Sequence, residues 1–539
     1  MPAGTPEQTL ESLWREAIRL HGDTAPKGVS GDFAVALRDP DGRVYLATDR
    51  FGIRALCYRV VGKELHFAER ADALADAQPV IDPQAIFDYL YFHVIPSPRT
   101  IYKEVFRVPP GHYVLFENGK LTVAPYWMPV FEAQKASFAD RRDEFRQILR
   151  DTVKTQLDGR EVGCFLSGGT DSSTVAGLLS EVSGKPARTF SIGFDADGYD
   201  EMEYSRLAAR HFNADHHEYY ITPDDLVRSV PDVAASYDQP FGNASVLPAY
   251  YCAKMAREAG IDVLLGGDGG DELFGGNTRY AKQRIFGAYE AIPAPLRSGL
   301  LEPVLLGIPP LSKIAGIKKA VSYVDQARVP MPDRMQTYNL LTRLGLENVL
   351  TADFLASVDT GAPLRQEREV YAACKTGSLV NRMLAFDWRY TLADSDLPKV
   401  VGATTLAGMG VGFPLLDNRL VDFSLKLPAS YKVKGLKLRW FFKEALRGFL
   451  PDEILTKKKQ GFGLPFGVWA NQHAPLKQLA ADSLRNLAAR GVVRADFVED
   501  LLTEHLPAFP GYYGVMVWIL MMLEQWLQQK APDWKLGDA

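Results

Sequence analysis

Cysteine is scarce in this chain, with four residues among 539, at Cys57, Cys164, Cys252 and Cys374. None of them has the C-x-x-C spacing that is typical of a zinc site. Four scattered thiols also do not form the framework of a small secreted domain. We therefore expect neither a structural zinc ion nor disulfide bonds, and a cytoplasmic location.

Long hydrophobic runs and an excess of one charge are also missing. The most apolar stretch, Val515 to Leu523, is much shorter than the roughly 20 residues of a membrane-spanning helix, and it predicts a buried C-terminal helix. The first residues, Met1 to Glu7, have no basic segment before an apolar core and predict no secretory signal. A formal net charge of −5 provides no basic surface. We expect neither nucleic acid nor a membrane as a partner.

The beginning of the chain has the alternating pattern of β-strands. Such alternation covers residues 31–38, 43–48 and 64–68, and the turn from Asp39 to Gly42 favours an antiparallel hairpin. A further β region from Tyr113 to Val123 ends near Trp127. The sequence predicts a small antiparallel β domain over residues 1–128.

The remaining residues, 129–539, predict a second and larger α/β domain. An amphipathic helix from Phe138 to Leu157 leads to an apolar strand at 162–166, and strands at 188–194, 216–221 and 261–265 alternate with helices. This alternation is typical of a doubly wound parallel sheet, which binds ligands at the carboxyl ends of its strands. From about Tyr280 onwards the pattern is mainly helical.

The most informative motif, Ser167 to Ser173, follows the first strand of this sheet and reads S-G-G-T-D-S-S. Glycines allow backbone N–H groups to surround an anion, and a helix N-terminus adds partial positive charge. An acid for Mg²⁺ and hydroxyls for phosphate oxygens stand at the same helix start. The alternative is an ordinary turn before a helix. The full motif resembles the loop of PP-loop ATP pyrophosphatases, which implies cleavage of ATP to AMP and pyrophosphate.

A second motif, Gly266 to Gly276, follows the strand at 261–265 and contains six glycines and three acids. A calcium-type acidic turn or a solvated loop is one explanation. Two acids three residues apart can instead hold Mg²⁺ on phosphates and leave another acid near the reacting group. The position after a parallel strand favours this second explanation.

Several motifs together resemble the synthetase domain of the asparagine synthetase superfamily over roughly residues 130–530. They occur in the family's order: Ser167–Ser172, Thr189–Phe194 with Tyr199–Glu201, Asp238–Phe241, Gly266–Glu272, Pro414–Arg419 and Lys459–Gly463. The superfamily includes β-lactam and carbapenam synthetases and lasso peptide cyclases. The resemblance implies an Mg²⁺- and ATP-dependent enzyme that adenylates a small-molecule or peptide carboxylate and forms an amide with ammonia or an amine.

The resemblance also implies roles for individual residues. The pyrophosphate would lie on the loop of Ser167, Gly168, Gly169, Asp171 and Ser172, and the nucleotide beside Ser191, Gly266 and Gly267. Asp171 and Asp271 would be the Mg²⁺ ligands.

Two further residues match catalytic positions of the family. Asp268 stands where asparagine synthetases have glutamate and β-lactam synthetase has a catalytic tyrosine, so it is a candidate for proton removal from the amine. Lys459 matches the lysine that stabilises charge in both transition states. Its neighbours Lys457 and Lys458 are expected to be solvated.

The N-terminal part resembles the second half of the class II glutamine amidotransferase domain, through Gly31–Leu37 and Asp49–Arg54. That domain uses an N-terminal cysteine as its nucleophile. Here residue 2 is Pro2, so we expect no glutamine hydrolysis unless the true start lies upstream. Half of a two-sheet sandwich would leave an apolar face for a second copy, a partner protein or a rearranged sheet to cover. Arg50 and Arg54 are expected to pack the domains together.

Two short segments depart from the family pattern. Val401-Gly402 and Gly410-Val411-Gly412 replace an Asp-Arg pair and a Glu-x-Arg motif. This loss of charge predicts a changed pocket or a less anchored loop, and it favours a substrate other than aspartate.

Three functions therefore remain open. The first is an AMP-forming amide ligase that uses free ammonia or an amine. The second is a glutamine-hydrolysing asparagine synthetase whose missing segment comes from a longer gene product or another chain. The third is a nucleotide-binding protein without activity.

Overall fold

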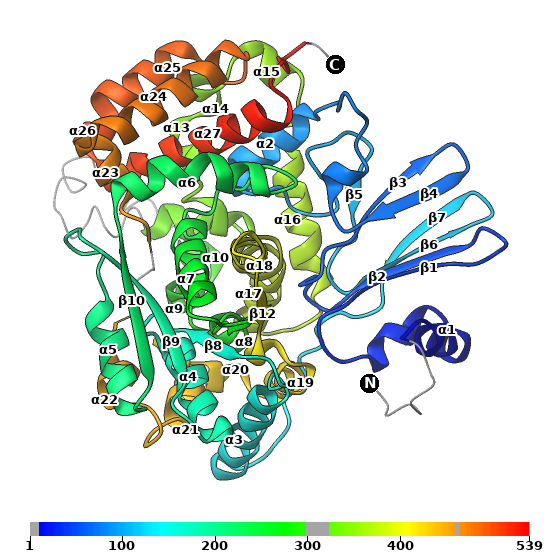
Figure 1. Ribbon diagram of the computed structural model, residues 1–539, viewed down its shortest axis with the longest axis vertical. Coiled ribbons are helices and arrows are strands. Elements are labelled where there is room, and N and C mark those ends of the chain that lie inside the picture. The colour runs from blue at the N-terminus through cyan, green and yellow to red at the C-terminus, as the bar shows by residue number, and fades with distance from the viewer. Residues whose placement is uncertain (1–9, 291, 298–322, 459–462, 538–539) are drawn as a thin grey trace.

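The computed structural model describes residues 10–290, 292–297, 323–458 and 463–537. Two antiparallel β-sheets near the N-terminus stand to one side of a large body built around a parallel sheet (Figure 1). The N-terminal part contains α1 (Leu10–His21), η1 (Gly22–Gly28), β1 (Ala34–Arg38), β2 (Val44–Thr48), β3 (Cys57–Val61), β4 (Glu64–Ala68), η2 (Ala71–Ala73), α2 (Pro83–Phe92), β5 (Phe106–Arg107), β6 (His112–Glu117) and β7 (Lys120–Pro125).

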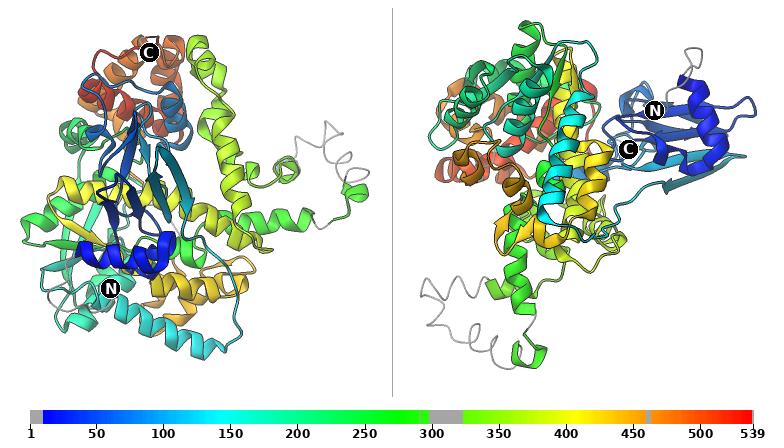
Figure 2. Two further views of the ribbon diagram at one scale, coloured as in Figure 1. Left: turned by 90° about the vertical axis from the view of Figure 1, so that its right-hand side faces the viewer. Right: turned by 90° about the horizontal axis from the view of Figure 1, so that it is seen from below.

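The two N-terminal sheets pack face to face, with strand orders β1-β2-β6-β7 and β4-β3-β5. Val44 and Leu46 of β2 meet Tyr58 of β3 in the space between them. The outer face of the larger sheet is covered by α1, whose Trp14 packs with Tyr45 (Figure 2). The face that was expected to need a second copy, a partner or a rearranged sheet is thus covered, on this larger sheet, by the amphipathic helix α1 of the same chain.

The body is a doubly wound α/β fold, as predicted. Its sheet has the order β10-β9-β8-β11-β12, and every neighbouring pair is parallel. The elements of this region are α3 (Phe138–Lys154), β8 (Val162–Phe165), α4 (Thr170–Ser183), β9 (Arg188–Phe194), α5 (Met202–His211), β10 (Asp215–Ile221), α6 (Pro223–Ser236), α7 (Val246–Glu258), β11 (Val263–Leu265), α8 (Gly270–Phe274) and β12 (Gly410–Gly412).

Both faces of the parallel sheet are buried. Along β11, Val263 and Leu265 join the cluster that contains α3 and α4, whereas Leu264 joins the cluster on the opposite face with α7. Successive side chains of a strand point to opposite faces, so an uninterrupted apolar strand is what a sheet with two covered faces requires.

Helices make up most of the remaining chain. They are α9 (Thr278–Glu290), α10 (Ala294–Leu296), η5 (Asp333–Gln336), α13 (Leu340–Leu344), α14 (Leu346–Val349), α15 (Ala352–Ala356), α16 (Ala362–Ala373), α17 (Leu379–Asp387), η6 (Trp388–Asp396), α18 (Leu397–Leu406), η7 (Pro414–Leu416), α19 (Asn418–Lys426), α20 (Ala429–Lys432), α21 (Trp440–Ala445), α22 (Asp452–Thr456), α23 (Phe466–Gln472), α24 (Ala474–Ala489), α25 (Ala495–Asp500), η8 (Leu501–His505), α26 (Leu506–Ala508) and α27 (Pro510–Lys530), with the short hairpin of β13 (Val433–Lys434) and β14 (Lys437–Leu438).

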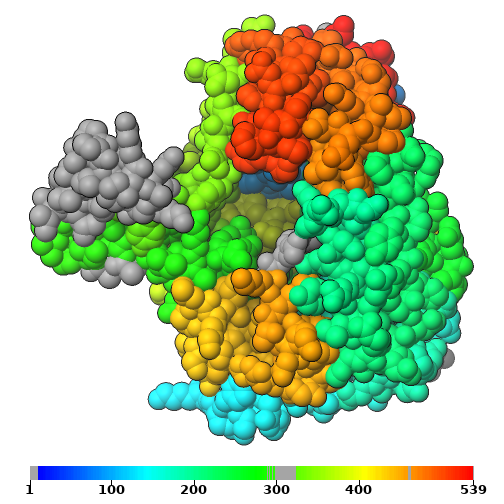
Figure 3. All heavy atoms as spheres, turned by 90° about the vertical axis from the view of Figure 1, so that its left-hand side faces the viewer, coloured from blue at the N-terminus to red at the C-terminus, as the bar shows by residue number. Residues whose placement is uncertain are grey.

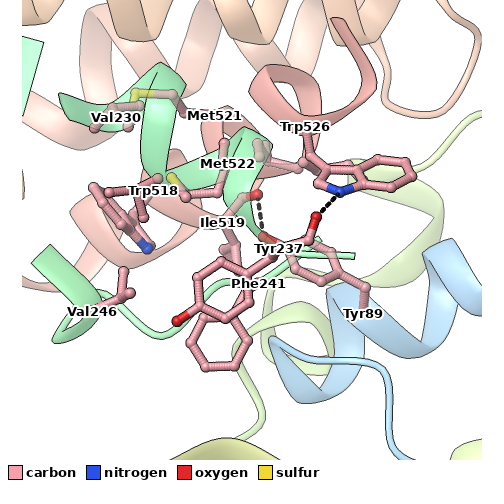
Figure 4. Packing of buried hydrophobic residues seen from close by; sticks show 14 of the residues in the cluster. Tyr89, Val230, Tyr237, Phe241, Val246, Trp518, Ile519, Met521, Met522 and Trp526 are labelled. Atoms are coloured by element: carbon pink, nitrogen blue, oxygen red, sulfur yellow. Dashed lines mark hydrogen bonds between the residues drawn. The ribbon is translucent and has the colours of Figure 1, made fainter. Parts of the chain in front are cut away.

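The C-terminal helix α27 lies in the main core, as its apolar sequence predicts (Figure 4). Its Trp526 donates from Nε1 to the carbonyl of Tyr237 at 3.1 Å. From the N-terminal part, Tyr89 of α2 donates its hydroxyl to the carbonyl of Ile519 at 2.8 Å. Helix α2 thus packs into the core of the body, and the division at residue 128 stays a prediction. Within the described residues, no helix is both long and apolar enough for a membrane crossing.

Candidate active site

A cavity of about 510 Å³ lies at the carboxyl ends of β8, β9 and β11. This volume lies within the range of small-molecule sites. The space-filling view shows a hollow where the green, orange and red-orange segments meet (Figure 3). Both predicted glycine-rich motifs contribute to the cavity. The predicted site residues in its wall are Ser167, Gly169, Asp171, Ser172, Ser191, Gly267, Asp268 and Asp271. Gly168 and Gly266 are not part of the wall.

Packing against α5 explains the glycine at position 168. Gly168 has a positive φ of 68°, and a Cβ atom there would lie 2.5 Å from Cβ of Tyr204. The loop is also tied at its ends, because the Ser172 hydroxyl accepts a hydrogen bond from the Ser167 amide at 3.2 Å. A tight turn is therefore held in place before α4, and the first residues of that helix, Thr170 to Ser172, line the cavity.

Ser191 supports this loop from the neighbouring strand β9. Its hydroxyl donates to the carbonyl of Leu166, which also accepts from the Ser205 hydroxyl at 3.0 Å. The predicted contact of Ser191 with a nucleotide stays a prediction, since in the structure its hydroxyl is bonded to the backbone of the loop.

The two acids predicted to bind Mg²⁺ lie next to each other although they are 100 positions apart in sequence. One guanidinium nitrogen, Nη1 of Arg439, lies 2.5 Å from Oδ2 of Asp171 and 2.9 Å from Oδ1 of Asp271. A Cβ atom on Gly270 would lie 2.3 Å from the Asp171 carboxylate, and one on Gly276 would lie 1.6 Å from that of Asp271. The glycines of the second motif thus leave room for both carboxylates.

This arrangement fits a divalent cation. Two carboxylates that contact one cationic nitrogen are close enough to contact one metal ion, and Mg²⁺ is commonly held by one or two carboxylates together with substrate phosphates. Within the described residues, no three His, Cys, Asp or Glu side chains form a metal site by themselves. The two carboxylates beside the Ser167 loop suit a cation that also binds a phosphate.

Asp268 belongs to a second cluster of charges in the cavity. Nζ of Lys399 lies 3.8 Å from Oδ1 of Asp268 and 3.0 Å from Oδ1 of Asp396. Burial raises the pKa of Asp268, the charge of Lys399 opposes this rise, and the charge of Asp396 adds to it. A carboxylate with a raised pKa is a stronger proton acceptor, which suits a general base.

The wall also contains charged side chains to which the sequence assigns no catalytic or binding role. Nζ of Lys457 lies 2.9 Å from Oε1 of Glu201 and above the ring of Tyr204. Lys443 also lines the cavity, and burial followed by the charge of Arg439 lowers its pKa. The prediction that Lys457 is solvated is wrong, because its side chain is only 10% exposed.

Some of the missed residues carry a recognisable signal. Lys399 is the single charged residue of helix α18, and a buried lysine requires a charged partner. Arg439 carries no such signal, because its role depends on two acids that are distant in sequence. The predicted catalytic Lys459 lies outside the described residues.

The segments that depart from the family pattern are ordered parts of the fold. Residues Gly410–Gly412 form β12, which pairs with β11, so the predicted less anchored loop is wrong. At Gly402, a Cβ atom would lie 2.3 Å from the Tyr237 hydroxyl. The space that a side chain at position 402 would take is thus occupied by Tyr237, which packs against α18.

Arg50 links the N-terminal part to the body. Its Nη1 lies 2.6 Å from Oδ1 of Asp422, and its guanidinium lies 4.9 Å from the centre of the Trp127 ring. These contacts agree with a packing role for Arg50.

All four cysteines are buried and unpaired. Burial raises the pKa of Cys57 to about 11 and that of Cys164 to about 12. Thiols of this kind carry little thiolate and are poor nucleophiles at neutral pH.

Known protein families match most of the chain. The family described as asparagine synthase matches residues 144–528, and the glutamine amidotransferase domain matches residues 12–127. Asparagine synthetase (glutamine-hydrolyzing) 1 of Bacillus subtilis strain 168 is 25% identical over 514 residues, which cover 94% of this chain and 79% of the relative.

Two other relatives differ in coverage and in name. Putative asparagine synthetase (glutamine-hydrolyzing) 2 of Methanocaldococcus jannaschii is 31% identical over 288 residues, which cover 51% of this chain and 54% of the relative. Amidase chyE of Penicillium rubens is 25% identical over 503 residues, which cover 83% of this chain and 72% of the relative.

Proposed function

Since the chain belongs to the asparagine synthase family of ATP-dependent amide-forming ligases, we propose that it adenylates a carboxylate and joins it to ammonia or an amine without hydrolysing glutamine itself. The observation that carries this proposal is the convergence of the Ser167 loop, the Asp171 and Asp271 pair, and Asp268 on one cavity. The loop is suited to bind a pyrophosphate, the carboxylates of Asp171 and Asp271 to bind a metal ion, and the carboxylate of Asp268 to accept a proton.

The reaction proceeds in two displacements. A carboxylate oxygen of the substrate attacks the α-phosphorus of ATP, and the P–O bond to pyrophosphate breaks. The amine nitrogen then attacks the carbonyl carbon, the C–O bond to AMP breaks, and the lost proton passes to Asp268. Mg²⁺ on Asp171 and Asp271 would neutralise phosphate charge. Lys459 is proposed to stabilise the charge of both transition states.

The absence of glutaminase activity is proposed from the chemistry of the thiols. Each of the four cysteines in the 539 residues is buried, and burial is the first cause of the raised pKa of each. An attacking thiol needs access and thiolate character. We therefore propose that the amide nitrogen comes from free ammonia or from an amine on the substrate or a carrier.

Glutamine-dependent synthesis is the second candidate. It is supported by the glutamine amidotransferase match at residues 12–127 and by relatives whose names include glutamine hydrolysis. In that case the nucleophile would have to come from another polypeptide or a longer gene product.

Pyrophosphate exchange tests the first displacement. We expect ATP–pyrophosphate exchange with the purified chain to be stimulated by one member of a panel of carboxylates that includes aspartate. ATP binding without exchange for any acid would contradict the ligase proposal.

Glutamate release from glutamine separates the two candidate functions. Release above a no-enzyme blank would overturn the ammonia-dependent proposal, and the Cys57→Ala variant serves as a comparison. The mass of the adenylated intermediate would identify the substrate.

A further inference from the structure

Arg439 contacts both proposed metal ligands through a single nitrogen atom. Its Nη1 lies 2.5 Å from Oδ2 of Asp171 and 2.9 Å from Oδ1 of Asp271. A guanidinium and a divalent cation both require carboxylate oxygens as partners. The arginine therefore uses two of the oxygens that a metal on these residues would need.

The backbone holds Arg439 firmly in this position. It has a left-handed φ of 51° immediately before α21, and its N–H donates to the carbonyl of Gly275 at 3.1 Å. The side chain is 9% exposed, and its Cδ would lie 3.0 Å from a Cβ on Gly276. A positive φ at a residue other than glycine is uncommon and needs support from its surroundings. The fold thus directs one buried cation at the acid pair.

Phosphates are alternative partners for the same cation. Arg439 and the Ser167 loop line one cavity, so a pyrophosphate on the loop would bring negative charge next to the guanidinium. Arginine binds phosphate as readily as carboxylate, with the same fork of N–H donors. Bound nucleotide would therefore provide a replacement for the carboxylate contacts that a metal takes over.

We propose that Arg439 makes divalent-metal binding dependent on the nucleotide, because the guanidinium competes with the metal for Asp171 and Asp271 until phosphates offer it other contacts. The inference rests on the proposed metal site and adds a positioning role for a residue outside both glycine-rich motifs. Metal and nucleotide then bind cooperatively, and Arg439 is the source of that cooperativity.

Binding of Mn²⁺ to the full chain tests this inference without any turnover. Free Mn²⁺ is measured by electron paramagnetic resonance, with and without α,β-methylene-ATP, which cannot be cleaved between its α and β phosphates. The wild type should bind Mn²⁺ weakly alone and more tightly with the analogue. The Arg439→Gln variant should bind Mn²⁺ alone at least about tenfold more tightly than the wild type, since one competing charge is removed. Its enhancement by the analogue should be smaller.

The Lys443→Gln variant is the matched control. Lys443 lines the same cavity, and the charges of Asp171 and Asp271 raise its pKa against the effect of burial. If only the total charge matters, both variants should tighten Mn²⁺ binding equally, and this would overturn the inference. Direct competition predicts that Lys443→Gln stays within about threefold of the wild type.

Two further outcomes are decisive. Unchanged Mn²⁺ affinity in Arg439→Gln, with normal binding in the presence of the analogue, overturns the competition and leaves the metal site standing. No Mn²⁺ binding by any variant with the analogue overturns the metal site as well. Circular dichroism checks the fold of Arg439→Gln. Should it fail to fold, Arg439→Met replaces it: methionine keeps an unbranched apolar stem and removes the positive charge, so tighter Mn²⁺ binding than the wild type is expected, and equal binding overturns the inference.

Discussion

The ammonium group of Lys399 lies 3.8 Å from the carboxylate of Asp268. Both side chains line the cavity, and Asp396 holds the same ammonium at 3.0 Å. The three residues form a chain of alternating charges, so the basicity of Asp268 depends on a lysine that stands 131 positions further along the sequence.

Replacement of this lysine should shift the pH dependence of amide formation. The positive charge of Lys399 lowers the pKa of Asp268 against the effect of burial, so Lys399→Gln should raise that pKa. A base works only when deprotonated, and activity is lost as the pH falls through its pKa. The acidic limb of the kcat/KM profile should therefore move up by about one pH unit. Lys399→Arg, which keeps the charge, should retain the wild-type limb; a shift in both variants would contradict this explanation.

The two groups of acids should separate the two displacements. Asp171→Asn removes a proposed metal ligand and should reduce ATP–pyrophosphate exchange at least about a hundredfold. Asp268→Asn removes the proposed base and should reduce amide formation by a similar factor while exchange continues. Comparison of exchange and product rates for each variant checks the assignment. Equal loss of exchange in both variants would argue against a separate role for Asp268.

The thiols should be unreactive in the native protein. Burial raises the pKa of Cys57 to about 11, and raises those of Cys164, Cys252 and Cys374 as well. Little thiolate exists at pH 8, so Ellman's reagent should label the folded chain slowly. All four thiols of the sequence should react after denaturation. A single fast thiol in the folded protein would point to a nucleophile and weaken the ammonia-dependent proposal.

A methyl group at position 402 should destabilise the fold. The new Cβ of Gly402→Ala would lie 2.3 Å from the hydroxyl oxygen of Tyr237. This hydroxyl donates hydrogen bonds to the carbonyls of Pro398 and Lys399. The tyrosine cannot move without losing these contacts, so the free energy of unfolding should fall by about 2 kcal/mol. Gly287→Ala is the control, since no atom other than its chain neighbours and its own helix backbone lies within 4 Å of the new Cβ, and alanine favours a helix. Urea denaturation measures the free energy of unfolding of both variants.

A buried lysine should make stability rise with pH. Lys432 is fully buried, and burial lowers its pKa from 10.5 to about 7. Between these values the unfolded chain binds one more proton at this side chain than the folded chain does. The free energy of unfolding should therefore gain up to about 1.4 kcal/mol per pH unit between about pH 7 and 10. Lys432→Met should remove this contribution. Urea denaturation of the wild type and the variant at several pH values measures how the free energy of unfolding changes with pH. The same change in both proteins would show that the assignment is wrong.

Elements with a clear periodic pattern were predictable from the sequence. Strands β1, β2 and β4, the strands around the Ser167 loop and the buried helix α27 all lie where alternation or apolar runs indicate them. The helix α2 was not predicted. Its residues from Ile86 to Tyr91 are almost entirely apolar, so no polar face reveals the helical period. These side chains are buried by contacts with α27 and other parts of the body.

The sequence by itself determined the chemistry that is local. In the Ser167 loop and the Gly266 to Gly276 segment, glycines and acids stand at fixed spacing along one stretch of backbone, and their order identifies the family. Only the tertiary structure decided which distant charges meet. Arg439 reaches Asp171 and Asp271, and Lys399 reaches Asp268, because the parallel sheet brings the carboxyl ends of its strands together and the later helices close over them. Such contacts depend on packing, which no local pattern encodes.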